Sequence, residues 1–347
     1  MSNPARELFT GCSVWITCFA LAGCGAPHGG DGTAPSSAST SSSVPAAKTQ
    51  IVSTTAMVTD IVKHVVGARA QVAGLIEAGV DPHLFKPTRS HVKQLSDADL
   101  VFYSGLTLEG RMGETFTQLQ RSGKSVFAVT ESLDKDYLRS PPDFAGHYDP
   151  HVWMDVKAWS QCVEHVAECL SKTDPAHADE YRANAQAYCA ELAKLDEYAR
   201  TSIQSIPKDQ RVLVTAHDAF EYFSRAYGIE VKSVQGVTTE SEAGVLDVNR
   251  LVDFLVDRKL PAIFVESSVN AKNIQAVIEG ARSRGVTVKI GGELFSDAMG
   301  VDGTYEGTYI GMIDHNVTLI ARALGGNAPE KGFQGKLAAT GSQGAEK

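Results

Sequence analysis

Short β-branched runs and amphipathic stretches alternate along most of this 347-residue chain. From Gln50 onward, each of the apolar runs QIVSTTAM, AQVAGLI, LVFYSG and KSVFAV is followed by a stretch with helical spacing of its apolar residues. The alternation resumes after Pro207 with the runs RVLVTA, VKSVQG, PAIFVES and VTVKIGG. Strands that alternate with helices pair in parallel, because each helix returns the chain to the same edge of the sheet. The sequence therefore predicts an α/β fold with two lobes, each a mostly parallel sheet flanked by helices.

The segment between the two halves predicts one long helix. Asp174 suits the N-cap and Pro175 the first helical position, and no further Pro and no Gly occurs before Pro207. One face of this helix carries its large apolar side chains, namely Tyr181, Tyr188, Leu192, Leu195 and Tyr198. Such a helix would extend roughly 45 Å, enough to reach both lobes as a shared spine. The alternative is two shorter helices, although nothing in the sequence marks a break.

The start of the chain has the features of an export signal. A short polar segment, in which Glu7 offsets Arg6, precedes an apolar run from Leu8 to Leu21 that is too short to span a membrane as a stable helix. The sequence LAGC, ending at Cys24, resembles a bacterial lipobox, which implies cleavage before Cys24 and a lipid on this cysteine. The Ser-, Thr- and Gly-rich stretch that follows cannot bury enough apolar surface to order itself.

These features divide the chain into regions. We expect an export signal at 1–24, a flexible stalk at 25–49, an N-terminal lobe at 50–172, a linking helix at 173–206, a C-terminal lobe at 207–325 and a flexible tail at 326–347. The net charge of −9 argues against a nucleic-acid partner, because phosphate backbones attract basic proteins. A lipid on Cys24 would tether the mature protein to a membrane, and we expect it to be a monomer.

Three cysteines remain after the export signal and Cys24, and an odd number forbids complete pairing. Cys162 and Cys169 are seven residues apart on one expected helix, roughly 10 Å by helical rise, which is beyond disulfide reach. Buried free thiols are therefore expected, while pairing of Cys189 with one of the other two remains open.

Histidine follows Asp-Pro twice, in DPHLFKPTRSHV from Asp81 and in GHYDPHVWMD, which ends at Asp155. Proline fixes its own φ and restricts the residue before it, so His83 and His151 each leave a stiff corner of the chain. A metal ligand would benefit from such a fixed direction. The alternative is two unrelated turns, because Asp and Pro favour turns whatever follows them.

Further polar side chains follow the expected strands, where ligands of open α/β sheets gather. His83 follows AQVAGLI, His217 follows RVLVTA, and Asp297 follows VTVKIGG after a short loop. With His151, each half of the chain then offers two side chains to a common cleft. Three imidazoles and one carboxylate suit zinc, and the carboxylate oxygen also suits manganese. Each residue alone is a weak signal, since a lone histidine more often packs and Asp297 could cap a turn.

Five segments resemble the TroA-like (also ZnuA-like) family, the metal-binding solute receptors of bacterial zinc and manganese ABC importers. They are DPHLFKPTRSHVKQLSDADLVFYSG, DPHVWMD, VTAHDAFEYFSRAYGIEVKSVQGV, LPAIFVESSV and GGELFSDAMG, in the family's order, and the resemblance extends from Gln50 to Leu324. It implies two α/β lobes joined by one long helix, with one metal ion bound between them. The family's four ligand positions correspond to His83, His151, His217 and Asp297.

The resemblance also bears on which metal is bound. Members regarded as manganese-selective carry Glu where this chain has His217, so histidine here favours zinc. Zinc-type members often carry a long His-rich loop before the second ligand, whereas this chain has only YLRSPPDFAGHYDPH, with His147 as its one additional imidazole. His147 could capture metal transiently or simply be a solvated loop residue.

We expect other residues to have supporting or surface roles. Glu266 ends the strand PAIFVES, and we read it as a carboxylate that orients a ligand imidazole, with turn capping as the alternative. Trp153 is expected to pack in the core beside His151 and exclude water from the site. The remaining histidines of the expected helices, for which surface positions are predicted, are His64, His91, His165, His177 and His315.

These residues are compatible with three functions. A metal receptor needs a closed set of protein ligands, whereas a metal-dependent hydrolase leaves a position for water and places a base beside it. The chain has four candidate ligands and no HExxH or GxSxG motif, and Glu266 is the residue that could revive the hydrolase. A surface adhesin fits a lipid tether but gives no reason for the four residues. The resemblance implies capture of zinc or manganese, delivery to a membrane permease with a cytoplasmic ATPase, and no enzymatic activity.

Overall fold

The computed structural model describes residues 48–338. The expected export signal, the lipidation site at Cys24, the stalk up to residue 47 and the tail from residue 339 lie outside these residues. Both lobes belong to one compact unit that begins at Ala47. Among the residues that the structure describes, no helix has the length and apolarity needed to cross a membrane.

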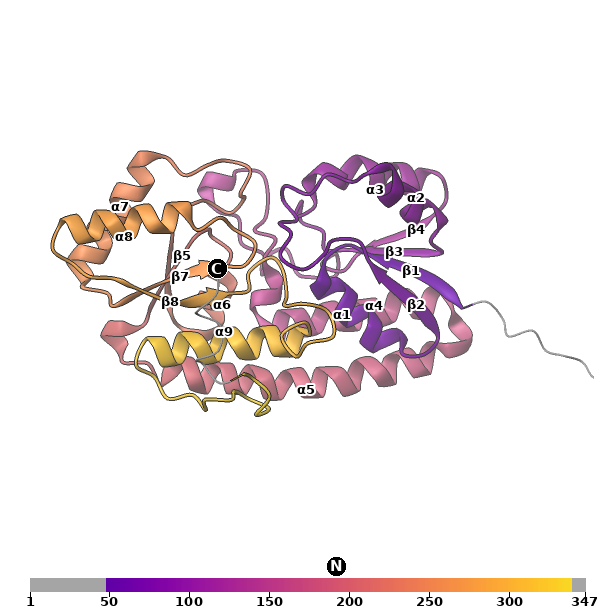
Figure 1. Cartoon of the computed structure of the whole chain (residues 1–347). Helices are drawn as coiled ribbons and strands as arrows, with labels where there is room; N and C mark the ends of the chain where they lie inside the picture. The colour runs from indigo at the N-terminus through magenta and orange to yellow at the C-terminus, as the bar shows by residue number, and fades with distance from the viewer. Residues whose placement is uncertain (1–47, 339–347) are drawn as a thin grey trace, which may run out of the picture. The chain divides into compact units, whose positions relative to one another are not determined.

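The N-terminal lobe is built on a four-stranded parallel sheet of order β2-β1-β3-β4 (Figure 1). Its strands are β1 (Thr49–Ser53), β2 (Ala70–Gly74), β3 (Leu100–Tyr103) and β4 (Ser125–Ala128). The helices that connect them are α1 (Ala56–Val66), α2 (Arg89–Asp97) and α3 (Gly113–Arg121), and a short 3₁₀ turn (Gly110–Met112) precedes α3. Every strand pair is parallel, as the alternating pattern predicts.

The C-terminal lobe contains two separate two-stranded parallel ladders, β5–β6 and β7–β8. Its strands are β5 (Val212–Thr215), β6 (Glu230–Ser233), β7 (Ala262–Glu266) and β8 (Lys289–Leu294). Its helices are α6 (Glu221–Tyr227), α7 (Val245–Arg258), α8 (Lys272–Ser283) and α9 (Tyr309–Ala323). Strands β5 and β7 lie side by side without forming a ladder, and the β7–β8 register shifts between Ile263 and Phe264. The sequence predicts these strands but not the division between them.

One long helix, α5 (Ala178–Gln204), follows a 3₁₀ turn (Pro175–His177) and runs beneath both lobes (Figure 1). It packs against α1 and α4 (Val156–Thr173) of the N-terminal half and against α6 and α9 of the C-terminal half. Its buried face includes Tyr181, Tyr188, Leu192 and Leu195, and Tyr198 packs partly buried against the same core. The predicted α/β fold with one unbroken long helix is confirmed.

The start of this helix differs from the expectation in one detail. Asp174 occupies the N-cap position of the 3₁₀ turn, but its side chain makes no capping hydrogen bond to the backbone. Its Oδ2 instead accepts hydrogen bonds from the hydroxyl of Tyr181 and from Nδ1 of His177, both at 2.7 Å. The carboxylate is therefore engaged by side chains of the first helical turns.

The chain after α9 continues to pack on the fold through residue 338. Ala328 and Leu337 are buried, and Phe333 packs partly buried against the main core. The backbone N–H of Phe333 donates to Oδ1 of Asp314 on α9 at 2.7 Å. The expected tail starts at residue 326, and the apolar side chains at 328, 333 and 337 explain why its first part is packed.

The three cysteines of the described residues are free. Cys162 and Cys169 are buried on α4, and Cys189 on α5 donates to the carbonyl of Ser160 at 3.5 Å. Burial raises the pKa of the Cys162 thiol above its ordinary value and that of Cys169 to about 11. The thiols are therefore protonated packing groups.

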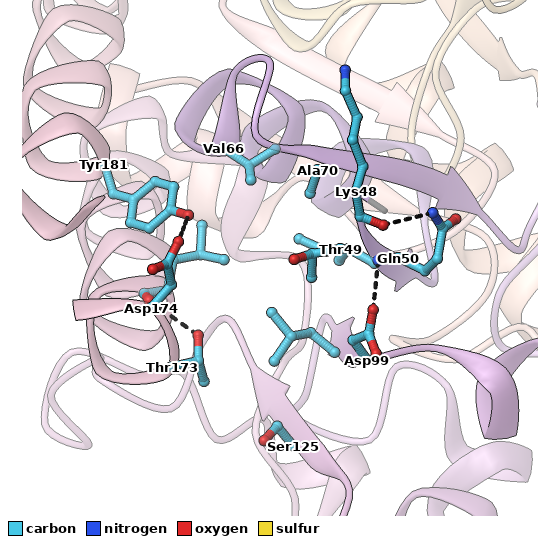
Figure 2. Close-up of a pocket in the computed structure, with 13 residues that line it drawn as sticks. Lys48, Thr49, Gln50, Val66, Ala70, Asp99, Ser125, Thr173, Asp174 and Tyr181 are labelled. Carbon is cyan, nitrogen blue, oxygen red and sulfur yellow. Dashed lines mark hydrogen bonds between the residues drawn. The ribbon is translucent and has the colours of Figure 1, made fainter. Parts of the chain in front are cut away.

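A hollow of about 740 Å³ lies at the edge of the N-terminal sheet where its strands begin (Figure 2). Its two carboxylates are already hydrogen-bonded: Asp99 Oδ2 accepts from the backbone N–H of Gln50 at 2.8 Å, and Asp174 Oδ2 accepts from Tyr181. The residues singled out from the sequence lie elsewhere, after the ends of strands in both lobes.

Candidate metal site

The candidate residues reach one point from four separate segments. His217 lies two residues after the end of β5, and Asp297 lies three residues after the end of β8. His83 stands on the loop between β2 and α2, while His151 arrives on the long connection after β4 and precedes a 3₁₀ turn (Val152–Met154). The strand-end rule therefore places His217 and Asp297 directly, and long loops carry the other two.

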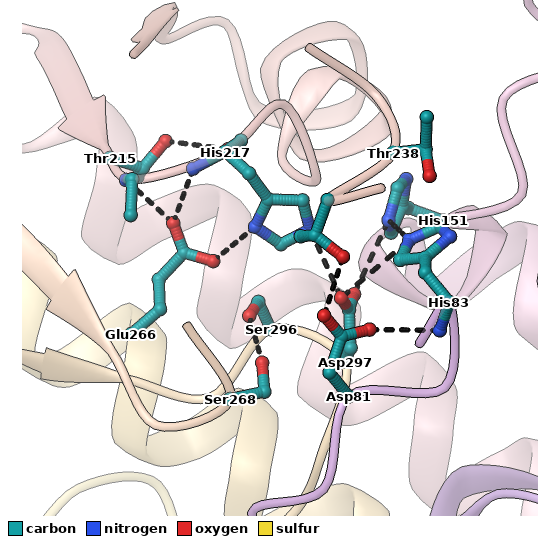
Figure 3. Close-up of polar contacts among 12 residues, drawn as sticks. Asp81, His83, His151, Thr215, His217, Thr238, Glu266, Ser268, Ser296 and Asp297 are labelled. Carbon is teal, nitrogen blue, oxygen red and sulfur yellow. Dashed lines mark hydrogen bonds and ion pairs between the residues drawn. The ribbon is translucent and has the colours of Figure 1, made fainter. Parts of the chain in front are cut away.

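The structure brings His83, His151, His217 and Asp297 together (Figure 3). One ligand atom from each lies within 4.8 Å of the others. Nε2 of His217 is 3.1 Å from Oδ2 of Asp297, and Nε2 of His151 is 3.3 Å from Oδ1. Nε2 of His83 is 3.3 Å from Nε2 of His151 and 3.7 Å from Asp297. The three Nε2 atoms and the carboxylate of Asp297 thus face a common centre.

These polar atoms are buried, and several lack hydrogen bonds. His151 and His217 are fully buried, and His83 is 4% exposed. Both carboxylate oxygens of Asp297 and Nε2 of His217 have no hydrogen-bond partner within the described part of the chain. Buried groups of this kind are normally satisfied, because an unpaired one costs about 1–3 kcal/mol. A divalent cation at the centre would satisfy all of them at once.

Glu266, the last residue of β7, holds His217 from the side away from the centre (Figure 3). Its Oε2 is 2.5 Å from Nδ1 of His217, and its Oε1 accepts the backbone N–H groups of Ala216 and His217 at 2.7 and 2.9 Å. The carboxylate therefore contacts both the imidazole and the turn. The two alternatives given for Glu266, orienting an imidazole and capping a turn, are thus both present. With Nδ1 donating to Glu266, Nε2 is the atom left to bind a metal.

Asp149 performs the same task for His151, and sequence reasoning missed it. Its Oδ1 is 2.8 Å from Nδ1 of His151 and accepts the His151 backbone N–H at 3.0 Å, while its Oδ2 is 2.7 Å from Nη1 of Arg139. The signal was present in the Asp-Pro-His motif, because an Asp side chain commonly accepts the N–H two residues later. Asp81 uses that geometry too, accepting the N–H of His83 at 2.8 Å.

The three imidazoles differ in pKa, because the neighbouring carboxylates raise the pKa of two of them above its ordinary value and not that of the third. Burial lowers the pKa of His83 to about 3, so this imidazole is neutral. Burial would also lower the pKa of His151, but the charges of Asp297 and Asp149 outweigh it and raise the pKa to about 9. Burial is likewise outweighed at His217, whose pKa rises well above 6.5 because of Glu266 and Asp297. Before metal binds, two imidazoles therefore carry protons.

The remaining residues lie outside this cluster. His147 is exposed on its loop and lies tilted against the ring of Phe144, with ring centroids 5.1 Å apart. Trp153 is fully buried, lies 5.2 Å from the His151 ring and donates from Nε1 to the carbonyl of Ser296, so it closes one side of the site. Among residues 48–338, this is the one cluster of three or more His, Cys, Asp or Glu side chains arranged to hold a metal ion.

The sequence of the chain is similar to those of metal-binding proteins. The family model for ZnuA, "Zinc-uptake complex component A periplasmic", matches residues 51–323. The zinc-binding protein TroA of Treponema pallidum is 49% identical over 277 residues, covering 80% of this chain and 89% of the relative. The manganese-binding lipoprotein MntA of Bacillus subtilis is 43% identical, covering 90% of this chain and 97% of the relative.

Structural similarity agrees with the sequence matches. The solved structure of periplasmic TroA from Treponema pallidum superposes with a TM-score of 0.77, covering 80% of this chain and 99% of that chain. A more distant relative, the metal ABC transporter substrate-binding lipoprotein FimA of Streptococcus parasanguinis, is 33% identical over 82% of this chain and 92% of its own. Nearly the whole described part of the chain takes part in these matches. The chain therefore belongs to the ZnuA family of periplasmic zinc-uptake components.

Proposed function

We propose that His83, His151, His217 and Asp297 together coordinate one zinc or manganese ion per chain. The observation that carries this proposal is the convergence of four buried ligand atoms, one from each residue, within 4.8 Å of one another. Within the described part of the chain, Nε2 of His217 and both oxygens of Asp297 make no hydrogen bond. The Nε2 atoms of His83 and His151, 3.3 Å apart, lie close enough to bind the same ion once His151 has lost its proton.

The chain is a metal-binding solute-binding protein of a zinc or manganese ABC importer, and its family consists of transport binding proteins and not of enzymes. Four protein ligands complete a tetrahedral zinc site and leave no position for a catalytic water. Glu266, the residue that could have served as a base, is engaged by His217 and two backbone N–H groups. A metal-dependent hydrolase is therefore disfavoured, and the adhesin alternative gives the four ligands no role.

We infer a preference for zinc over manganese. Three imidazole nitrogens suit zinc, whereas manganese is better served by oxygen ligands. The relatives carry both names, zinc for TroA and manganese for MntA. The substitution His217→Glu replaces one nitrogen with oxygen and should shift the ratio of zinc to manganese affinity toward manganese. An unchanged ratio in competition titrations would contradict this assignment.

The protein acts outside the cytoplasm on a lipid anchor, as its lipoprotein relatives indicate, and membership implies a permease as partner. We propose that Cys24 is the lipidated residue and that the stalk and the lobes have the boundaries given above. We also propose that the permease works with a cytoplasmic ATPase and that the protein is a monomer. Mass spectrometry of the membrane-extracted protein tests the lipid directly. A mature N-terminus other than Cys24 would contradict the anchor site.

Metal stoichiometry tests the site as a whole. Elemental analysis of the protein loaded with zinc should give one equivalent of zinc per chain. The substitution Asp297→Ala should weaken zinc binding by more than about 100-fold, which is the largest effect usual for a residue that only orients a ligand. His147→Ala is the matched control, because it removes an exposed histidine from the same region and should leave binding unchanged. One tightly bound equivalent retained in Asp297→Ala would refute the proposed ligand set.

A further inference from the structure

Arg139 lies on the connection between β4 and the 3₁₀ turn Pro142–Phe144. It contacts the carboxylate of Asp149, which in turn contacts the proposed ligand His151. Its Nη1 is 2.7 Å from Oδ2 of Asp149. The other oxygen of Asp149, Oδ1, accepts hydrogen bonds from the backbone N–H and from Nδ1 of His151. Asp149 is fully buried, so its second oxygen would be left without a charged partner if Arg139 were absent. The guanidinium thus determines whether Asp149 can hold His151 in place.

The same arginine reaches the other half of the molecule. Its Nη2 is 3.4 Å from Oε2 of Glu221, the first residue of α6. Its backbone N–H donates to the hydroxyl of Tyr222 at 3.0 Å, and that hydroxyl donates to the carbonyl of Asp149, also at 3.0 Å. Two adjacent residues of α6 therefore contact Arg139, and one of them, Tyr222, also contacts Asp149.

Helix α6 begins four residues after His217, which Glu266 holds in turn. His151 is consequently attached to the helix that follows another ligand, although the sequence places it in the N-terminal lobe. We propose that Arg139 is a positioning residue for metal binding, because it ties His151 to α6 and makes His151 and His217 one rigid pair. This inference rests on the proposed function, since it assumes that both imidazoles bind the ion.

The test compares metal dissociation and the absorption spectrum of bound Co²⁺ in the native chain and in Arg139→Met. Loss of the tie should speed Co²⁺ release to a chelator by about tenfold, the lower end for residues that orient a ligand, and should alter the spectrum because His151 can tilt. Arg139→Lys should restore part of the native behaviour, since an ammonium can pair with Asp149 but cannot fork to Glu221 as well.

Arg225→Met provides the matched control. Arg225 on α6 packs over the rings of Tyr137 and Tyr222 and donates to the carbonyl of Tyr137, so it supports the same loop without touching Asp149. Its loss should lower the thermal midpoint of the metal-free protein and leave the Co²⁺ spectrum and release rate unchanged. A purely structural role for Arg139 would make the two variants alike, which would overturn the proposal.

Glu221→Gln keeps the proposal testable if Arg139→Met fails to fold. Glu221 is partly exposed and touches Arg139 without contacting Asp149, so its loss removes only the contact between the Arg139 guanidinium and α6. Faster Co²⁺ release with an unchanged thermal midpoint supports the tie, and native release contradicts it. A native chain that binds no Co²⁺ would contradict the proposed function itself, whereas native binding unaffected by Arg139→Met would contradict only this inference.

Discussion

Each Asp-Pro-His motif forms the same local turn, in which the aspartate accepts the N–H of the histidine two residues later. Proline between them donates no hydrogen bond and limits the backbone, so the histidine is fixed by both covalent and hydrogen-bonded constraints. The aspartates then make different second contacts: Asp81 accepts from the hydroxyl of Thr239, while Asp149 pairs with Arg139. A repeated tripeptide thus supplies two of the proposed ligands, each with a fixed direction.

Glu266→Gln should weaken metal binding by about 10–100-fold while leaving the fold intact. Glutamine can still accept a backbone N–H, but its NH₂ group would face Nδ1 of His217 and favour the tautomer with the proton on Nε2. That proton would occupy the atom needed by the metal. Chelator competition measures the affinity, and circular dichroism checks the fold. Glu293→Gln, on the half-exposed strand β8, is a control with the same chemical change; equal effects of both substitutions would refute the orienting role.

At this scale, the sequence predicts ligands better than their supports. His217, Asp297 and Glu266 could be found because each lies at or just after the end of a strand. Arg139 could not be found, since its contacts with Asp149 and Glu221 depend on how a long connection folds back. No local pattern encodes such a contact.

Among the elements, the long helix α5 is the common support of both lobes. Its buried residues pack against helices from both halves, so the spacing of the two halves depends on it. Its continuity could be predicted because helical periodicity and the lack of Pro and Gly are local properties. The division of the C-terminal strands into two ladders could not, because apolar runs identify strands without identifying their hydrogen-bond partners.

Leu192→Ala should lower the free energy of unfolding by about 2–5 kcal/mol, since Leu192 is fully buried on α5 and its truncation leaves a cavity. Denaturant unfolding of the metal-free protein measures the change. Lys194→Ala, on the exposed side of the same helix, should have little effect. Equal stability of the two variants would show that this helix face is not part of the core, contrary to the structure.

Over the whole molecule, the charges around the site suggest that the ion replaces protons. Three carboxylates contact the imidazoles, from Asp297, Asp149 and Glu266, and one guanidinium, that of Arg139, pairs with Asp149. Without metal, protons on His151 and His217 balance the remaining two negative charges. A divalent cation supplies the same charge when both imidazoles bind it through deprotonated Nε2. Binding is then an exchange of two protons for one ion, which avoids leaving net charge in a buried site.

This exchange makes metal affinity depend on pH over a wider range than the sequence suggests. Histidines with their ordinary pKa would make the affinity fall near pH 6.5. Because the pKa of His151 is raised to about 9 and that of His217 is also raised, protons compete with metal below about pH 9. Affinity should therefore keep rising between about pH 6.5 and about pH 8.5, by up to about 100-fold per unit for two displaced protons. Calorimetry in buffers of different ionisation enthalpy should detect about two protons released per zinc ion at neutral pH. Release of no protons, with constant affinity over this range, would mean that the imidazoles are already neutral in the metal-free protein.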